Sequence, residues 1–198
     1  MNIEKKTILI TGANRGIGRA LVNEALRRGA KKIYAGTRVA LQHADDRVMP
    51  LNLDVTSVSQ IQRAAEVDTL DVLINNAGVA IYDDLSNLDV IEQHLAVNFL
   101  GVLKVTQSLR ALLAGQGVTV HAVVLGPIDT DMNRGFAIPK ASPESAAQRI
   151  FDGLEHGDEE IFPDPASQSI ADVWRTGAFK SLERQFAAFV PARAASLG

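Results

Sequence analysis

The sequence contains no cysteine, which excludes a disulfide scaffold, a thiolate zinc site and a cysteine nucleophile. No apolar run approaches the roughly 18 residues that a membrane-spanning helix requires, and the run that follows Lys6 meets Gly12 too early for a secretion signal. Basic residues number 20 and acidic residues 23, so the net charge of −3 argues against a protein held to nucleic acid by phosphate contacts. We therefore expect a soluble cytoplasmic protein without a nucleic-acid or membrane partner.

The remaining composition is that of an ordinary globular protein, with 46% hydrophobic and 22% charged residues in a chain of 198. This length indicates a single domain over residues 1–198. The four histidines have no spacing typical of metal ligands, so we predict no metal site at His43, His94, His121 or His156.

Short apolar runs alternate with segments of helical periodicity along the chain. The expected strands are Thr7–Thr11, Lys32–Thr37, Val48–Leu53, Val72–Asn75, Val118–Leu125 and Glu160–Phe162. The expected helices are Gly16–Arg28, Ser57–Ala65, Asn87–Ala114, Ser142–His156 and a weaker Ser169–Phe189 that breaks at Gly177. Strands that alternate with helices predict an α/β fold, a doubly wound parallel sheet (Rossmann fold) in three α/β/α layers.

Three helix ends carry residues typical of helix boundaries. Gly29 follows the first helix as its C-terminal glycine. Ser57 with Gln60 predicts a capping box at the start of the second helix. Ser142 stands at the N-cap position of a later helix, and Pro143 occupies its first turn.

A glycine-rich turn, TGANRGIG at residues 11–18, joins the first expected strand to the first expected helix. Gly12 permits the tight turn, Gly16 lets a pyrophosphate approach the backbone, and Gly18 lets the helix pack on the strand. Free N–H groups at the helix start would bind the anion. In this context the turn predicts dinucleotide binding rather than a plain turn. The residues expected to form this site are Gly12, Asn14, Arg15, Gly16, Ile17 and Gly18.

The end of the second expected strand bears on the choice of dinucleotide. NAD-binding proteins usually place Asp or Glu there to bond the ribose 2′-hydroxyl, whereas this chain has Thr37 and Arg38. The guanidinium groups of Arg38 and Arg15 are suited to pair with an added 2′-phosphate, which predicts NADP as the cofactor. The alternative is that both arginines are solvated surface residues.

Five motifs, taken in order, resemble the classical short-chain dehydrogenase/reductase family. They are the glycine turn, Asp54-Val55, Asn75-Asn76-Ala77-Gly78, Asn98 and the loop LGPIDT at residues 125–130. The resemblance implies hydride transfer between NADP and a small-molecule carbonyl or secondary alcohol. Members of the family often associate, so the resemblance also implies a homo-oligomer.

The resemblance implies a role for each matching residue. Asp54 would bond the adenine amino group with the Val55 backbone beside it, and Asn98 would organise a water chain behind a catalytic lysine. The others would line the cofactor's ribose (Asn76, Ala77 and Gly78) or hold the nicotinamide carboxamide (Ile128 and Thr130). The alternative for residues 75–78 is a polar turn. The loop at residues 131–139 would form an apolar substrate lid, against the alternative of a packed surface loop.

The family's chemistry also needs a serine, and a tyrosine followed four residues later by a lysine, whose ammonium lowers the tyrosine pKa from about 10. This chain lacks that set, because Tyr34 and Tyr82 are its two tyrosines and neither has a lysine at that spacing. Relative to the family, about 45 residues are missing between Asn98 and Thr130, which amounts to one strand–helix unit with its loop. The alternatives are therefore an NADP-dependent oxidoreductase, a non-catalytic shortened relative that binds dinucleotide or pairs with other subunits, and a shortened product that does not fold stably.

The position of the missing unit predicts two structural consequences. A deletion near Gln107 and Ser108 would fuse two parallel helices into Asn87–Ala114, and the alternative is an omitted segment at the same place. We expect so long a helix to kink or end near Gly101 or Gln107, or to project from the body. A gap in the sheet would leave buried backbone groups unpaired at about 1–3 kcal/mol each, so we expect the fourth and fifth strands to pair directly.

Overall fold

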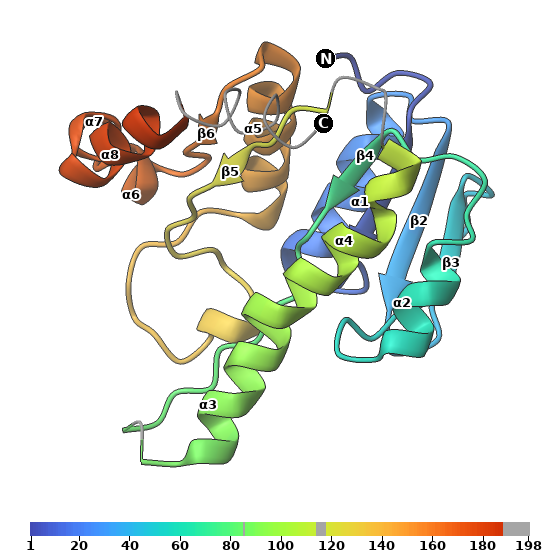
Figure 1. Cartoon of the computed structure of the whole chain (residues 1–198), viewed down its shortest axis with the longest axis horizontal. Helices are drawn as coiled ribbons and strands as arrows, with labels where there is room; N and C mark the ends of the chain where they lie inside the picture. The colour runs from blue at the N-terminus through green and yellow to red at the C-terminus, as the bar shows by residue number, and fades with distance from the viewer. Residues whose placement is uncertain (85, 114–117, 188–198) are drawn as a thin grey trace.

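The computed structural model describes residues 1–84, 86–113 and 118–187 (Figure 1). Its main sheet has four strands in the order β3-β2-β1-β4, and every pairing in it is parallel. The strands are β1 (Thr7–Thr11), β2 (Lys32–Thr37), β3 (Val48–Asn52) and β4 (Val72–Ile74). Ile8 of the central strand β1 lies opposite Ile33 of β2 and Val72 of β4. This order confirms the predicted doubly wound parallel sheet.

Helices cover both faces of the main sheet. Ile8 and Ile10 belong to an apolar cluster on the face covered by α1 (Gly16–Arg27) and α5 (Pro143–His156). Leu9, between them in sequence, belongs to a second cluster on the face covered by α2 (Val58–Ala64) and α4 (Val102–Leu113). Successive side chains of a strand point to opposite faces, so β1 supplies both cores. The predicted three α/β/α layers are confirmed.

Two of the three predicted helix ends are confirmed, and one is wrong. Gly29 adopts a left-handed φ of +78° just after α1, and Ser142 accepts a 3.1 Å hydrogen bond from the first turn of α5. Ser57 precedes α2, but its side chain makes no capping hydrogen bond. The side-chain oxygen of Gln60 instead accepts a hydrogen bond of 2.8 Å from the backbone N–H of Asp54. A capping box needs that side chain at the helix end, so the competing contact prevents it.

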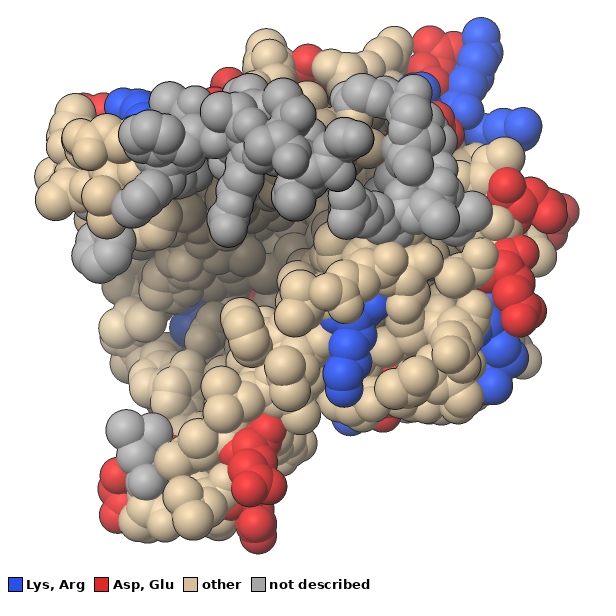
Figure 2. All heavy atoms as spheres, viewed as in Figure 1, with Lys and Arg blue, Asp and Glu red and all other residues tan. Residues whose placement is uncertain are grey.

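The fifth and sixth strands form a separate two-stranded sheet. Ala122–Val123 (β5) pairs in parallel with Glu160–Ile161 (β6), while β4 is bonded to β1. The expected direct pairing of the fourth and fifth strands is therefore wrong. The predicted eight-residue strand also shrinks, because Val118 and Val120 are 55% and 85% exposed and pair with no strand among the described residues. On the face shown in Figure 2, the molecule is hollowed between β5 with its following loop and α4.

Helix packing joins the part of the chain that carries β5 and β6 to the main sheet. Phe151 of α5 is fully buried in the cluster that includes α1, and the guanidinium carbon of Arg28 lies 5.6 Å from the centre of its ring. Arg28 also pairs with Glu155 and Asp152 of α5, each at 2.6 Å. The second sheet thus keeps its place through the α1–α5 layer, with no strand of the described residues between β4 and β5.

The long helix predicted at Asn87–Ala114 is continuous over its described part, which ends at Leu113. It comprises α3 (Leu88–His94), a π-helical segment η1 (Leu95–Gly101) and α4. The helix passes Gln107 unbroken, and the change from π- to α-helical geometry falls at Gly101. A Cβ at Gly101 would lie 2.8 Å from a methyl group of Val55, so glycine permits this close approach. None of the residues of α3 is buried, and α3 projects from the body (Figure 1).

The C-terminal part contains three short helices, α6 (Pro165–Gln168), α7 (Ala171–Thr176) and α8 (Ala178–Ala187). The predicted break at Gly177 is confirmed, and the predicted end at Phe189 lies outside the described residues. A one-turn 3-10 helix, η2 (Asp131–Asn133), lies in the loop after β5. In the described parts of the chain, no helix combines the length and apolar character that crossing a membrane requires.

Candidate functional site

The glycine turn lies at the carboxyl end of β1 and has the backbone that the sequence predicts. Gly12 and Gly16 adopt left-handed φ angles of +68° and +51°, which favour glycine. A Cβ at Gly18 would lie 2.1 Å from the carbonyl oxygen of Gly12, so no other residue fits there without displacing the turn. The turn is therefore close-packed, and glycine is required at each of the three positions.

The start of α1 is suited to bind an anion. Its N-cap residue, Arg15, makes no side-chain capping hydrogen bond, and the first turn holds no acidic residue. The N–H groups of that turn and the positive end of the helix dipole remain available to a phosphate. Asn14 and Arg15 are exposed, and Ile17 packs against the core. The donor set therefore fits the pyrophosphate of a dinucleotide.

A polar contact fastens the end of β4 to the glycine turn. Asn76 donates from its side-chain amide to the carbonyl oxygens of Thr11, at 2.9 Å, and Gly12, at 3.2 Å. The hydroxyl of Thr11 in turn accepts hydrogen bonds from the backbone N–H groups of Asn76 and Ala77. The sequence analysis did not identify Thr11 as a site residue, although a hydroxyl at the end of a buried strand could have indicated a contact with a neighbouring loop. Residues 76–77 are thus held beside the turn, as a cofactor site requires.

Asn98 closes the other side of this loop. Its side chain accepts a hydrogen bond of 2.9 Å from the N–H of Val79 and donates one of 2.8 Å to the carbonyl oxygen of Val79. A Cβ at Gly78 would lie 3.4 Å from the Asn98 side-chain oxygen, so the two residues are neighbours. Asn98 therefore ties η1 to the loop after β4. Its role behind a lysine remains a prediction.

Asp54 follows β3 and is held by its neighbour Thr56. One carboxylate oxygen accepts hydrogen bonds from the Thr56 N–H at 2.8 Å and the Thr56 hydroxyl at 2.7 Å. Burial raises the pKa of the Asp54 carboxyl, but these hydrogen bonds and the charge of Arg38 outweigh burial and lower it. Asp54 is therefore a charged acceptor near neutral pH. Arg38 is exposed just past β2, and Val55 is buried against Gly101.

The loop after β5 approaches the glycine turn. Ile128 is 2% exposed and forms an isolated parallel bridge with Ala141. A methyl carbon of Thr130 lies 3.1 Å from the place where a Cβ on Gly16 would sit. The structure therefore brings this loop and the glycine turn together.

Asp164 positions the start of that loop, and the sequence analysis missed it. It is 1% exposed, and it accepts a 2.7 Å hydrogen bond from the N–H of Gly126. Burial raises the pKa of the Asp164 carboxyl, but the hydrogen bonds from Gly126 and Ser167 outweigh burial and lower it. The capping box of Asp164 with Ser167 at the start of α6 was the sequence signal available.

Neither tyrosine lies beside a lysine at the glycine turn. Tyr34 sits within β2, packed against the cluster below α2 and α4, and Lys32 donates to its hydroxyl at 3.5 Å. Tyr82 lies in the loop after β4 and is 66% exposed. Its ring meets that of Phe136 edge-on, with centroids 4.9 Å apart. This contact joins the loop after β4 to the segment 131–139.

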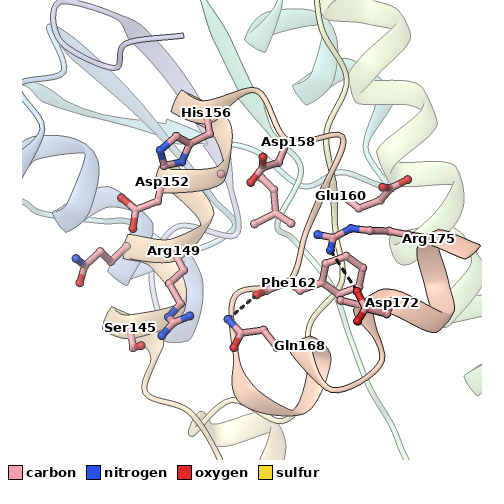
Figure 3. A pocket seen from close by; sticks show the side chains of 14 residues that line it. Ser145, Arg149, Asp152, His156, Asp158, Glu160, Phe162, Gln168, Asp172 and Arg175 are labelled. Atoms are coloured by element: carbon pink, nitrogen blue, oxygen red, sulfur yellow. Dashed lines mark hydrogen bonds and ion pairs between the residues drawn. The ribbon is translucent and has the colours of Figure 1, made fainter.

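A cavity of about 670 Å³ lies elsewhere, between α5, β6 and the helices α6 and α7 (Figure 3). Its wall includes Arg149 and His156 of α5, facing Gln168 and Arg175. None of the residues predicted for the dinucleotide site lines it. The cavity therefore does not belong to the site at the glycine turn.

A model of the short chain dehydrogenase family matches residues 6–116 of this chain. An uncharacterized oxidoreductase of Schizosaccharomyces pombe is 31% identical over 121 residues, which cover 56% of this chain and 41% of that protein. The 3-oxoacyl-acyl-carrier-protein reductase of Vibrio cholerae is 27% identical over 190 residues, covering 68% of this chain and 78% of that protein. The chain thus spans less than half the length of the first of these relatives.

A solved structure of a short chain dehydrogenase from Burkholderia cenocepacia, in complex with NADP, matches with a TM-score of 0.82 at 26% identity. The match covers 93% of this chain and 98% of that chain. An NADPH-bound carbonyl reductase from chicken fatty liver matches with a TM-score of 0.64 at 18% identity, covering 79% and 93% of the two chains. The latter likeness shows the fold alone.

Proposed function

Because the chain belongs to the short-chain dehydrogenase family, we propose that it binds NADP(H) at the carboxyl end of its main sheet. The observation that carries the proposal is the glycine turn, where Gly12 and Gly16 are left-handed and Gly18 has no room for a Cβ. A turn of this shape before an uncapped helix start suits a pyrophosphate. The NADP complex of the Burkholderia cenocepacia relative supports the choice of cofactor.

Several side chains hold the remaining parts of the cofactor in this proposal. The exposed guanidinium groups of Arg15 and Arg38 pair with the 2′-phosphate, and the Asp54 carboxylate accepts from the adenine amino group. Residues 76–78 line a ribose. The backbone of Ile128 and the hydroxyl of Thr130 hold the carboxamide. When bound, the nicotinamide supplies or accepts hydride, and the substrate class is a small-molecule carbonyl or secondary alcohol.

Dinucleotide titrations of the wild type and of a glycine variant test the cofactor proposal. NADPH should bind more tightly than NADH, because only NADPH carries the phosphate that two guanidinium groups can pair with. Gly18→Ala should abolish binding, because its Cβ would strike the turn. Gly135→Ala is the matched control, since a Cβ there meets nothing within 4 Å. Thermal melts of both variants separate lost binding from lost folding. Equal affinity for NADH and NADPH would contradict the assignment to NADP.

A second function, dinucleotide binding without turnover, is favoured by the surroundings of the tyrosines. Tyr82 is at the right end of the sheet but faces Phe136, and no described lysine pairs with it. Proton transfer by a tyrosine in this family needs a lysine ammonium beside the phenol, so Tyr82 does not match the catalytic set. NADPH consumption with a panel of carbonyl compounds separates the two functions. Turnover supports the oxidoreductase, and binding without turnover supports the non-catalytic relative.

The lengths of the alignments bear on the same question. The match to the Vibrio cholerae reductase runs over 190 positions, although it draws on 68% of this 198-residue chain. That relative therefore contributes positions with no counterpart here, which supports the proposed internal deletion of one strand–helix unit.

We further propose that the protein acts in the cytoplasm, and that it forms a homo-oligomer.

A further inference from the structure

An ion pair links the glycine turn to the loop after β5. Arg15 Nη1 lies 3.7 Å from Asp131 Oδ2, although 115 residues separate the two along the chain. The other carboxylate oxygen, Oδ1, pairs with Arg134. Arg15 is one of the two guanidinium groups assigned above to the cofactor's 2′-phosphate. The group that is to bind phosphate therefore already has a carboxylate beside it.

The backbone around Asp131 holds that carboxylate in place. Asp131 opens the 3-10 turn η2, in which the N–H of Asn133 donates to the carbonyl oxygen of Thr130 at 3.0 Å. The side-chain amide of Asn133 donates to the carbonyl oxygen of Ile128, also at 3.0 Å. Thr130 itself lies against Gly16 of the glycine turn. Asp131 is thus presented to the turn by a braced segment rather than by a free loop.

We propose that Asp131 competes with the 2′-phosphate for Arg15 and so limits the preference of this site for NADP over NAD. The proposal rests on the proposed function. The Asp131 carboxylate beside Nη1 already neutralises part of the Arg15 charge, so the guanidinium attracts a phosphate less strongly while the carboxylate stays there. NADPH binding must therefore either displace the Asp131 carboxylate or share the Arg15 guanidinium with it, whereas NADH, which has no 2′-phosphate, does neither. Asp131 is accordingly a specificity-determining residue that makes no contact with the reacting atoms.

The size of the effect follows from exposure. The side chains of Arg15 and Asp131 are 64% and 53% exposed, and exposed pairs of this kind contribute little. Removing the carboxylate should therefore tighten NADPH binding by about two- to fivefold at low salt. The change should shrink as salt rises, because ions screen an exposed pair.

Asp131→Asn tests the proposal, with Asp129→Asn as the matched control. Asp129 lies in the same loop, is exposed and has no ion pair in the described residues, so both variants remove one negative charge from the same region. Fluorescence titration with NADPH and NADH measures the dissociation constants. We expect D131N to bind NADPH about two- to fivefold more tightly, with NADH affinity unchanged, and D129N to match the wild type for both.

A double-mutant cycle with Arg15→Gln shows whether Asp131 acts through Arg15. In the R15Q background, D131N should leave NADPH affinity unchanged. Three results would overturn the proposal: weaker NADPH binding in D131N, equal gains in D131N and D129N, or an undiminished gain in the R15Q background. Absence of NADPH binding by the folded wild type would instead overturn the proposed function, and the competition with it. If the wild type binds NADPH but D131N does not bind it more tightly, the competition is refuted and the proposed function stands.

Discussion

Arg28, just after α1, donates a hydrogen bond of 2.6 Å to Asp152 of α5, and this contact bridges two parts of the molecule that share no sheet. The same guanidinium bonds Glu24 and Glu155, and its side chain is 10% exposed. Three carboxylates thus converge on one cation. The attachment of the second sheet depends on this layer, because the sheet itself is interrupted between β4 and β5.

Replacing Arg28 should therefore destabilise the whole fold. Arg28→Ala leaves the three carboxylates without their shared cation and removes the stacking on Phe151, so we expect a loss of about 1–3 kcal/mol in the free energy of unfolding. Urea denaturation measures the loss. Arg63→Ala, an exposed arginine of α2 without an ion pair in the described residues, should change stability by less than about 0.5 kcal/mol. Similar losses in both variants would contradict the proposed bridging role.

Thr11→Val should separate the hydrogen bonds of the Thr11 hydroxyl from the packing of the side chain. Thr11 is 1% exposed, and its hydroxyl accepts from the N–H groups of Asn76 and Ala77. Valine keeps the volume but leaves these donors without that acceptor, at a cost of about 1–3 kcal/mol. We also expect weaker NADPH binding, because the end of β4 is no longer held against the glycine turn. Thr7→Val in the same strand is the control, since the Thr7 hydroxyl makes no hydrogen bond to a described residue. An unchanged T11V protein would show that water or a shifted loop satisfies the donors.

Asp164 should give the protein a pH-dependent stability. Its folded pKa lies below the ordinary value of 3.8, so its contribution is complete above that value and is lost as pH falls through the folded pKa. Asp164→Asn presents an amide where the N–H groups of Gly126 and Ser167 need an acceptor, and we expect a loss of about 1–3 kcal/mol at pH 7. The difference from the wild type should narrow as the pH falls below 3.8 and through the lowered pKa of Asp164. Urea unfolding at several pH values tests this, with the exposed Asp68→Asn as control. A difference that stays constant with pH would assign the loss to packing rather than to charge.

Besides the parallel main sheet and its layers, the features predicted correctly from the sequence are local ones. The backbone of the glycine turn and the closure of α1 at Gly29 depend on residues a few positions apart, and the structure confirms both. The hydrogen bond between Asn76 and Thr11 depends on how two strands lie together, which no local pattern specifies. The wrong capping box at Ser57 has a local origin, because the Gln60 side chain has two possible partners nearby and bonds the N–H of Asp54, six positions earlier, instead of the helix end.

The fifth strand shows a different limit of prediction. Its apolar run indicates a tendency to be buried, but periodicity does not reveal which neighbour will cover it. Here α5 anchors the second sheet on α1, and β5 pairs with β6. β5, which the sequence analysis expected to pair with β4, therefore belongs to the second sheet and not to the main sheet.

Substitutions in this region should distinguish an exposed strand from a buried one. Val120 is 85% exposed, so Val120→Ala should change the free energy of unfolding by less than about 0.5 kcal/mol. Leu109 of α4 is fully buried, and Leu109→Ala should cost about 2–5 kcal/mol through the cavity it leaves. Chemical denaturation of the two variants gives the comparison. A loss above about 2 kcal/mol in V120A would place this segment in a buried sheet, because only a packed side chain is worth that much. Direct pairing of β4 with β5, which the structure contradicts, would be one arrangement that buries Val120.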